Sequence, residues 1–423
     1  MSEAAIWEEH SSIPESPAVS RSGWVMVGVA ALAMVATLPG RTHGLGMITE
    51  RLLNDSSLEM TRTGFGHVNL WATLSGSLFC LGVGGLIDRY GVRLMLGVVM
   101  FSLGGVVLAM THLSSVPLLF IAILLTRGLG QSALSVVSIT IVGKWFDRNV
   151  SLPMAVYSVL MAAGFIAAAL IGRSYANVDW RVFWSTLGWV IVALAVVLTA
   201  IARDRRCDTR TVREETIRSR PLDFTHREAL LTPMFWVGAL GISLYGMIVS
   251  GISLFNESIL VDQGFPKEVY YESLAIGTGV GVFAQLSAGV LGMYVPVNRL
   301  LSIALLLLAA SLLWLTQLSS YGDVVTYVMI NAVAGGMLTV LFFSAWSQLY
   351  GQTHLGKIQG SAQMLTVIAS AFGPLLFAQA KEWTGSYHLL LWGLAGVVLL
   401  TAIIAGLTPL PRHPSLAETG SDR

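Results

Sequence analysis

The sequence is poor in charge and in cysteine. Only 12% of its 423 residues are charged and 54% are hydrophobic, whereas soluble domains carry about 25% charged residues. A soluble core could not bury so much apolar surface. The two cysteines, Cys80 and Cys207, are too few for a disulfide framework. The composition therefore indicates a membrane protein that disulfides do not hold together.

Other absences exclude kinds of site. A net charge of +1 gives no bulk attraction to nucleic acid, so we expect no nucleic-acid partner. The sequence contains no CxxC, HExxH or phosphate-binding Gly-Lys-Ser stretch, so we expect no metal and no cofactor. The first 20 residues are polar and lack an apolar run, which argues against a cleavable signal peptide.

Long apolar stretches are what the sequence has in abundance. A bilayer core about 30 Å thick needs about 20 residues of helix, and twelve stretches meet this need. Two of them contain one arginine each: 24–47 contains Arg41 and 118–143 contains Arg127. The other ten are free of charge: 64–87, 94–110, 150–172, 182–202, 234–256, 273–298, 300–321, 324–350, 358–380 and 389–407. We therefore expect an all-α membrane protein with twelve transmembrane helices.

Lysine and arginine in the connecting segments predict the orientation, because cytoplasmic loops carry an excess of both. With the N-terminus inside, the inner segments hold 17 of the 25 basic residues and the outer segments hold six. Both termini are therefore predicted to be cytoplasmic. The long polar stretch 203–233 follows the sixth span, and its mixed charges indicate a solvated loop, with contact to anionic lipid left open. The predicted parts are a cytoplasmic tail (1–23), a six-helix bundle (24–202), a cytoplasmic loop (203–233), a second six-helix bundle (234–407) and a cytoplasmic tail (408–423).

A motif follows the second span. Gly84, Asp88, Arg89, Gly91 and Arg93 form the pattern G-x-x-x-D-R-x-G-x-R. The two glycines allow helices and a tight turn to approach closely, and we expect the three charged residues to make ion pairs at the cytoplasmic rim.

This pattern, at this place, resembles the loop signature of the major facilitator superfamily. The stretch 127–130, Arg-Gly-Leu-Gly, is similar to the arginine-glycine signature of that family's fourth helix. The resemblance covers 24–407 and implies a secondary transporter, not an enzyme, with two six-helix bundles. Between spans eight and nine the repeat of the loop motif, 292–299, lacks the Asp-Arg pair, so we expect an asymmetric gate.

Within the superfamily, 39–41 and 350–360 look like the monocarboxylate and oxalate–formate exchanger branch. That branch often carries a charged residue inside the eighth span, and 273–298 has none. The resemblance implies an organic anion as solute, which the residues of this span do not support by themselves.

Ionisable groups inside a span are functional candidates because their burial in lipid is costly. Arg127 is predicted to lie about 15 Å below the outer surface, either as an anion or proton-relay site or as a structural arginine bonded to helix carbonyls. Arg41 is predicted about 25 Å into its span, in the outer third, either in the substrate path or as an interfacial anchor. Pro39 and nearby glycines should break this helix and leave polar groups around Arg41, Thr42 and His43.

Two further residues could carry a coupling proton. His43 titrates near neutrality, and Glu257 lies toward the outer end of the seventh span, where a solvated interfacial role is the alternative. Uncharged polar residues inside spans complete the candidate set, and helix-to-helix hydrogen bonds are the alternative role for each of them. They are Asn69, Tyr245, Gln285, Asn331 and Gln363.

We therefore expect a multi-pass protein of the cell (inner) membrane that works as a single chain. Its predicted function is to carry a small, monocarboxylate-like organic anion by alternating access, coupled to protons or to a counter-anion. Its partners would be the solute and the bilayer. The alternatives are an exporter of an amphipathic or cationic compound, as in drug efflux, and a membrane sensor that transports nothing. The sequence leaves the solute and the direction of flux open.

Overall fold

The computed structural model describes residues 21–53, 55, 62–146, 150–175, 178–204 and 223–412. All regular secondary structure in these residues is helical. Eleven of the described helices are long and apolar enough to cross a membrane, and Arg21–Val35 is a shorter apolar helix. The prediction of an all-α membrane protein is confirmed. The tails 1–20 and 413–423 and most of the loop 203–233 lie outside the described residues.

The first predicted span is broken in its middle. Helix α1 (Arg21–Val35) is followed by a short 3₁₀ turn, η3 (Leu38–Gly40), and then by α2 (Thr42–Leu53). Pro39 has no amide proton to donate, and a Cβ at Gly44 would lie 1.8 Å from the carbonyl oxygen of Leu38. The predicted break is present, and it explains why eleven continuous spans are found rather than twelve.

The other helices of the first half form five spans. Two of these spans are not single continuous α-helices. One consists of α3 followed directly by α4, and in the other a π-helix, η4, separates α6 from α7. The bounds are α3 (Arg62–Ser77), α4 (Phe79–Tyr90), α5 (Val92–Met110), α6 (Val116–Thr126), η4 (Arg127–Leu134), α7 (Ser135–Trp145), α8 (Ser151–Ser174) and α9 (Trp180–Ile201).

The second half begins with a short helix and continues with six long ones. Helices α12, α15 and α16 extend several residues beyond the predicted spans, because charged or polar residues at their ends continue the helix past the apolar stretch. The bounds are α11 (His226–Leu231), α12 (Pro233–Asp262), α13 (Lys267–Leu291), α14 (Val297–Leu315), α15 (Tyr321–Tyr350), α16 (Leu355–Thr384) and α17 (His388–Leu407).

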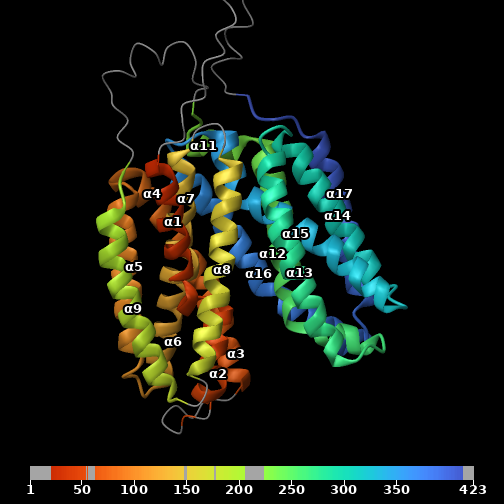
Figure 1. The fold of residues 1–423 in the computed structure, drawn as a ribbon, viewed down its shortest axis with the longest axis horizontal. Helices are drawn as coiled ribbons and strands as arrows, with labels where there is room; N and C mark the ends of the chain where they lie inside the picture. Colours follow the sequence, from red (N-terminus) through yellow and green to blue (C-terminus); the bar gives the residue numbers. More distant parts are fainter. Residues whose placement is uncertain are drawn as a thin grey trace, which may run out of the picture.

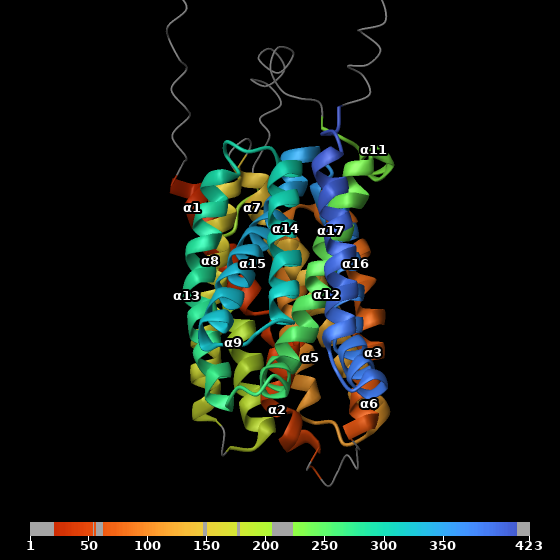
Figure 2. The same cartoon turned by 90° about the vertical axis from the view of Figure 1, so that its right-hand side faces the viewer.

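Each half has its own buried core. The largest cluster of buried apolar residues draws on the first half and on one residue of α15, Phe343. A second cluster draws on the second half and on one residue of α8, Ala155. The axes of the helices are roughly parallel to one another, as Figure 2 shows. We call the end of the molecule where α1 begins and α11 lies the terminal side, and the opposite end the distal side (Figure 1).

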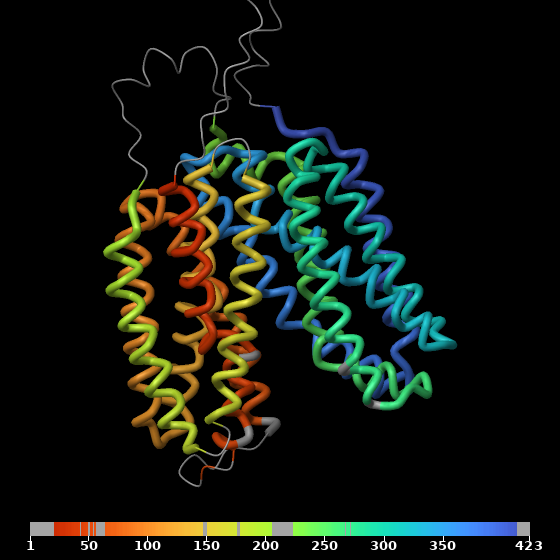
Figure 3. Tube along the Cα trace, in the orientation of Figure 1, coloured from red at the N-terminus to blue at the C-terminus, as the bar shows by residue number. Residues whose placement is uncertain are grey.

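The two halves meet at the terminal side and diverge toward the distal side (Figure 3). Close contact between α4 and α16 depends on glycine: a Cβ at Gly84 would lie 2.4 Å from the Gly356 carbonyl oxygen, and one at Gly360 would lie 2.4 Å from the Cys80 carbonyl oxygen. Helices α8 and α13 approach in the same way, because a Cβ at Gly292 would lie 2.6 Å from Ser151 Oγ. Small residues thus bring the halves together at two places.

Gly84→Ala is expected to separate α4 from α16 and to destabilise the folded protein by roughly 1–3 kcal/mol, the usual cost of overpacking. Thermal unfolding of the purified protein measures the effect. Gly82→Ala is the matched control, since a Cβ there meets nothing within 4 Å and alanine favours the helix. Equal melting temperatures for the two variants would contradict this account of the contact.

Candidate functional site

Arg127 lies inside the first half and bonds to the broken span. Its side chain is 2% exposed. Nη1 donates to the Gly40 carbonyl at 3.0 Å, to Thr42 Oγ1 at 3.3 Å and to Gln131 Oε1 at 2.8 Å, and Nη2 donates to Asn69 Oδ1 at 2.5 Å. Arg127 thus supplies a hydrogen bond to one carbonyl of the interrupted backbone, that of Gly40, and another to the Thr42 side chain at the start of α2.

Arg127 is also the first residue of the π-helix η4 (Arg127–Leu134), a rare form that is frequent at functional sites. Backbone contact is close here as well, because a Cβ at Gly40 would lie 2.2 Å from the Thr126 carbonyl oxygen and one at Gly130 would lie 3.1 Å from the Cα of Gly40. The glycines of both segments therefore let η3 pack directly against η4.

Arg41 is held differently. Its Nε donates to Thr37 Oγ1 at 2.7 Å, and its Nη2 donates to Ser135 Oγ at 3.0 Å and contacts Met34 Sδ at 2.8 Å. The guanidinium also lies over the Phe165 ring, with 5.4 Å from Cζ to the ring centroid. The residue is half-buried, and its Nη1 donates to no described residue. One edge of this cation is thus available to a ligand.

The depth of Arg41 differs from the prediction. Ser135 begins the 11-residue helix α7, so it lies about 15 Å from the terminal end of that helix. The Arg41 guanidinium that bonds to it is therefore deep in the molecule rather than in the outer third. The helix breaks before Arg41, whose backbone is extended, and the side chain reaches back to Thr37 and Met34. A residue count along a continuous helix includes neither effect.

The charges of the two guanidinium groups are balanced by no acid in the described part of the chain, since no described carboxylate forms an ion pair with Arg41 or Arg127. Arg127 is surrounded by neutral oxygens, and so is Arg41, apart from the sulfur of Met34. One buried and one half-buried cation, without a counter-charge among the described residues, give the first half a positive interior, which favours an anion.

The remaining predicted site residues do not all join this group. Asn69 and Thr42 do, through Arg127. Gln285 instead accepts a hydrogen bond from Ser158 Oγ at 2.7 Å, between α13 and α8. Within the second half, the Tyr245 hydroxyl donates to the Gly335 carbonyl at 3.3 Å and Asn331 Oδ1 accepts from Ser311 Oγ at 3.4 Å.

The last three predicted residues are placed in part. Gln363 is 6% exposed, and its Oε1 has no hydrogen-bond partner in the described structure. Glu257 is half-buried near the distal end of α12. His43 belongs to α2, and its side chain lies outside what the structure describes.

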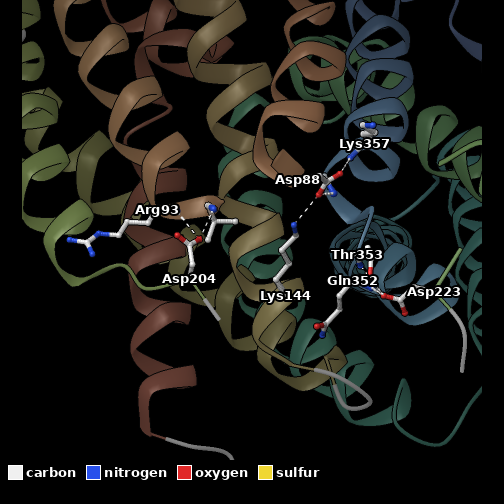
Figure 4. Close-up of polar contacts among 10 residues, drawn as sticks. Asp88, Arg93, Lys144, Asp204, Asp223, Gln352, Thr353 and Lys357 are labelled. Atoms are coloured by element: carbon white, nitrogen blue, oxygen red, sulfur yellow. Dashed lines mark hydrogen bonds and ion pairs between the residues drawn. The ribbon is translucent and has the colours of Figure 1, made fainter. Parts of the chain in front are cut away.

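The motif after the second span forms a junction between the halves (Figure 4). The Asp88 carboxylate is 7% exposed and pairs with Lys144 Nζ at 2.9 Å. It also accepts from the backbone amides of Gly356 and Lys357, both at 3.0 Å. These are amides of the first turn of α16, where the helix dipole favours an anion. One carboxylate of the first half thus binds the start of a helix of the second half.

The two arginines of the motif do not form the predicted ion pairs with any described residue. Arg89 is exposed and lies over the ring of Tyr90. The side chain of Arg93 donates to the Thr199 carbonyl at 3.0 Å, and its backbone amide donates to Asp204 Oδ1 at 3.2 Å. Arg89 lies in the last turn of α4 and Arg93 in the first turn of α5, and both are exposed. Solvent and neutral partners therefore replace the expected carboxylates.

Gly91 makes the turn of this motif with φ +87°, a conformation that favours glycine. A Cβ there would lie 2.8 Å from the carboxylate of Asp204, which also accepts from the Val92 amide at 2.7 Å. The second half contains a similar arrangement. Gly351 has φ +80°, and Asp223 accepts from the amides of Gln352 and Thr353 at 3.1 and 2.9 Å.

The junction on the α8–α13 side has no corresponding carboxylate among the described residues. Gln348 Nε2 on α15 donates to Ser151 Oγ at the start of α8 at 2.8 Å. Between the two sides, Gln352 Nε2, just before α16, donates to the Phe146 carbonyl, just after α7, at 2.9 Å. Neutral hydrogen bonds thus join the halves beside the charged contact of Asp88.

Several contributors to the site were not predicted. Gln131 lies four residues after Arg127, so helical spacing could have indicated it. Thr37 and Met34 precede Arg41 by four and seven residues, which is the same signal. Ser135 and Phe165 come from distant parts of the chain, and no local pattern indicates them.

Asp88→Asn is expected to weaken the junction, because the neutral side chain loses the pair with Lys144 and presents amide protons to the start of α16. A buried charged hydrogen bond contributes about 1.5–3 kcal/mol, so the amides of 356 and 357 should exchange with deuterium at least about tenfold faster. Hydrogen exchange followed by mass spectrometry measures this. Asp204→Asn is the control, because Asp204 caps a helix of its own half, and equal exchange in both variants would contradict the assignment.

His226, at the start of α11, predicts a dependence on pH. Its Nε2 is 2.9 Å from Ser361 Oγ. Burial lowers the pKa of His226. The nearby charges of Lys357 and His354 lower it further, whereas that of Asp88 raises it. Since the unfolded value is about 6.5, the folded state resists protonation, and stability should fall as the pH drops through about 6.5. When the pH is lowered from about 7.5 to 5.5, the melting temperature should fall less for His226→Gln than for the wild type. His388→Gln, which also loses an imidazole, is the control and should follow the wild type.

Comparison with known proteins agrees with this architecture. The family model described as Major Facilitator Superfamily matches residues 18–374. Among curated proteins, none matches significantly. Among solved structures, the human organic anion transporter MFSD10 (TETRAN) superposes with a TM-score of 0.66 at 16% identity, over 92% of this chain and 100% of that one. At this identity the likeness shows the fold alone.

The family match covers most of the chain and includes both signatures first noticed in the sequence, at 84–93 and at 127–130. The broken first span, the buried arginines and the glycine contacts between the halves lie within the matched range or at its end. The chain is a membrane transporter, not an enzyme, and belongs to the Major Facilitator Superfamily.

Proposed function

We propose that this protein is a secondary active transporter of the cell membrane that moves a small, monocarboxylate-like organic anion by alternating access. The observation that carries the proposal is the Arg41 guanidinium, deep in the first half, half-buried and without a carboxylate partner among the described residues. Its free Nη1 gives an anion a charge-assisted hydrogen bond. The described spans hold no carboxylate at mid-depth, which disfavours a cationic solute.

The two arginines have different roles in this proposal. Arg127 uses Nη1 and Nη2 on protein oxygens, so it positions the broken span and adds positive potential. Arg41 keeps one edge unused and would contact the solute directly. A single free edge matches one carboxylate, and the Phe165 ring beside it would border the apolar part of the molecule.

Alternating access is supported by where the halves touch. The α4–α16 and α8–α13 contacts lie at the terminal side, while the ribbons diverge at the distal side (Figure 1). If the terminal side is cytoplasmic, as the distribution of lysine and arginine predicts, this is the state closed to the cytoplasm. Rocking the halves would release Asp88 from α16 and open the terminal side.

The proposal includes coupling of solute transport to the movement of a proton or of a counter-anion. His43 is adjacent to Thr42, which bonds to Arg127, and Glu257 lies toward the distal end of α12. A proton carried by either residue would make uptake depend on the pH gradient, whereas exchange would depend on an anion loaded in the opposite compartment.

The printed title of the similar human structure describes an organic anion transporter. Its solute class agrees with the proposal. The proposal itself stands on the two arginines, because the likeness at 16% identity shows only the fold.

Arg41→Gln is expected to lower the rate of uptake of radiolabelled monocarboxylates into proteoliposomes by about 100-fold or more, because a charged contact to the anion is lost. Its melting temperature should change little, since only part of its guanidinium is used by the protein. Arg127→Gln should instead lower the melting temperature strongly, because buried oxygens lose their donor. Unchanged uptake of monocarboxylates and dicarboxylates by Arg41→Gln would refute the anion proposal.

A further inference from the structure

Helices α7 and α16 face each other across the boundary between the halves. A Cβ at Gly143, near the terminal end of α7, would lie 2.6 Å from Leu355 Cδ2, at the start of α16. The two helices run in opposite directions, because α7 ends and α16 begins at the terminal side. Positions further into α16 therefore lie opposite earlier positions of α7.

Polar side chains without partners gather on these facing surfaces. Gln359 is 0% exposed, and neither Oε1 nor Nε2 has a hydrogen-bond partner in the described structure. Gln363 Oε1, one turn further along α16, also lacks one, and so does Thr140 Oγ1 on α7. We call Gln359, Gln363 and Thr140 the polar seam.

Helical spacing places the three residues toward the boundary between α7 and α16. Gln359 follows Leu355 by four residues and Gln363 follows by eight, so both lie on or beside the face of α16 that meets α7. Thr140 precedes Gly143 by three residues, which puts it on the face of α7 that meets α16. Their depths agree, since each step of about one turn leads away from the terminal side.

The position of Gln363 connects the seam to the arginine site. Eight residues from Leu355 correspond to about 12 Å along α16, and Ser135 is eight residues before Gly143 on α7. Gln363 therefore lies at about the level of Ser135, whose hydroxyl accepts from Arg41. The seam runs from this level to the terminal junction beneath Asp88.

Orphaned polar groups of this kind are unfavourable where the halves are closed. They would be hydrated once the halves part on this side. We propose that the polar seam lines the route between the Arg41 site and the terminal side, and that Gln359 favours opening of this route because it lacks partners in the closed state. This inference rests on the proposed alternating access and adds the residues that set the balance between its two states.

The test compares the same substitution, glutamine to methionine, at positions 359 and 348. Gln359→Met keeps the length of the side chain and removes an orphaned amide, so it should favour the closed state. Gln348→Met removes the hydrogen bond to Ser151 between the halves, so it should favour opening. Hydrogen exchange of 355–363, in the full-length protein in lipid nanodiscs, should slow by about fivefold or more in the first variant and accelerate in the second.

Thr140→Val tests the facing helix with a change of similar shape, and it should also slow exchange of 355–363. If Gln359→Met or Thr140→Val leaves this exchange unchanged or accelerates it, the inference is overturned, because the polar groups would then be satisfied in the closed state.

Failure of the proposed function has a separate readout. An absence of anion uptake by wild-type proteoliposomes would reject the transported solute, while the opposite responses of the two glutamine variants would still support the seam. Where uptake is measured, Gln359→Met should lower its maximal rate and leave KM nearly unchanged, since the variant alters the equilibrium between states and leaves Arg41 intact.

Discussion

The interaction on which the first half depends is the hydrogen bond from Arg127 to the carbonyl oxygen of Gly40. A helix interrupted inside a membrane leaves backbone groups without partners, and lipid offers none. Arg127 satisfies this carbonyl, and its other donors hold Thr42, Gln131 and Asn69 in place. The break and the buried cation therefore support each other: without the arginine the turn would be costly, and without the turn the arginine would lose two of its four oxygen partners.

This dependence explains why Arg41 can take another role. The turn at Leu38–Gly40 redirects the chain, so Arg41 leaves the helical path and reaches back to Thr37 and across to Ser135. Both Nη atoms of Arg127 bond to the protein, and only its buried Nε has no partner in the described structure, whereas Arg41 leaves the Nη1 end of its guanidinium without a described partner. A site with one structural and one available guanidinium can hold its shape while its ligand comes and goes.

The sequence predicted well what depends on local chemistry. Apolar length located the spans, Pro39 and the glycines located the break, and Gly84 indicated a close approach of two helices. It failed where partners come from distant segments. The depth of Arg41 depends on a reversal that a residue count ignores, and Asp88 binds backbone amides of α16, which carry no sequence signal. Arg89 and Arg93 have the right spacing for ion pairs but emerge into solvent, where neutral partners suffice.

The two carboxylates that flank the long connection between the halves have a further consequence. Asp204 is bonded to the amides that begin α5, and Asp223 to the amides that precede α16. Each end of the connection is thus hydrogen-bonded to its own half: Asp204 lies three residues after α9, and Asp223 three residues before α11. The free energy of closing a loop grows only slowly with its length, so residues added between these two points would leave both bundles undisturbed. The position is accordingly suited to the insertion of a reporter domain that senses movement of the halves.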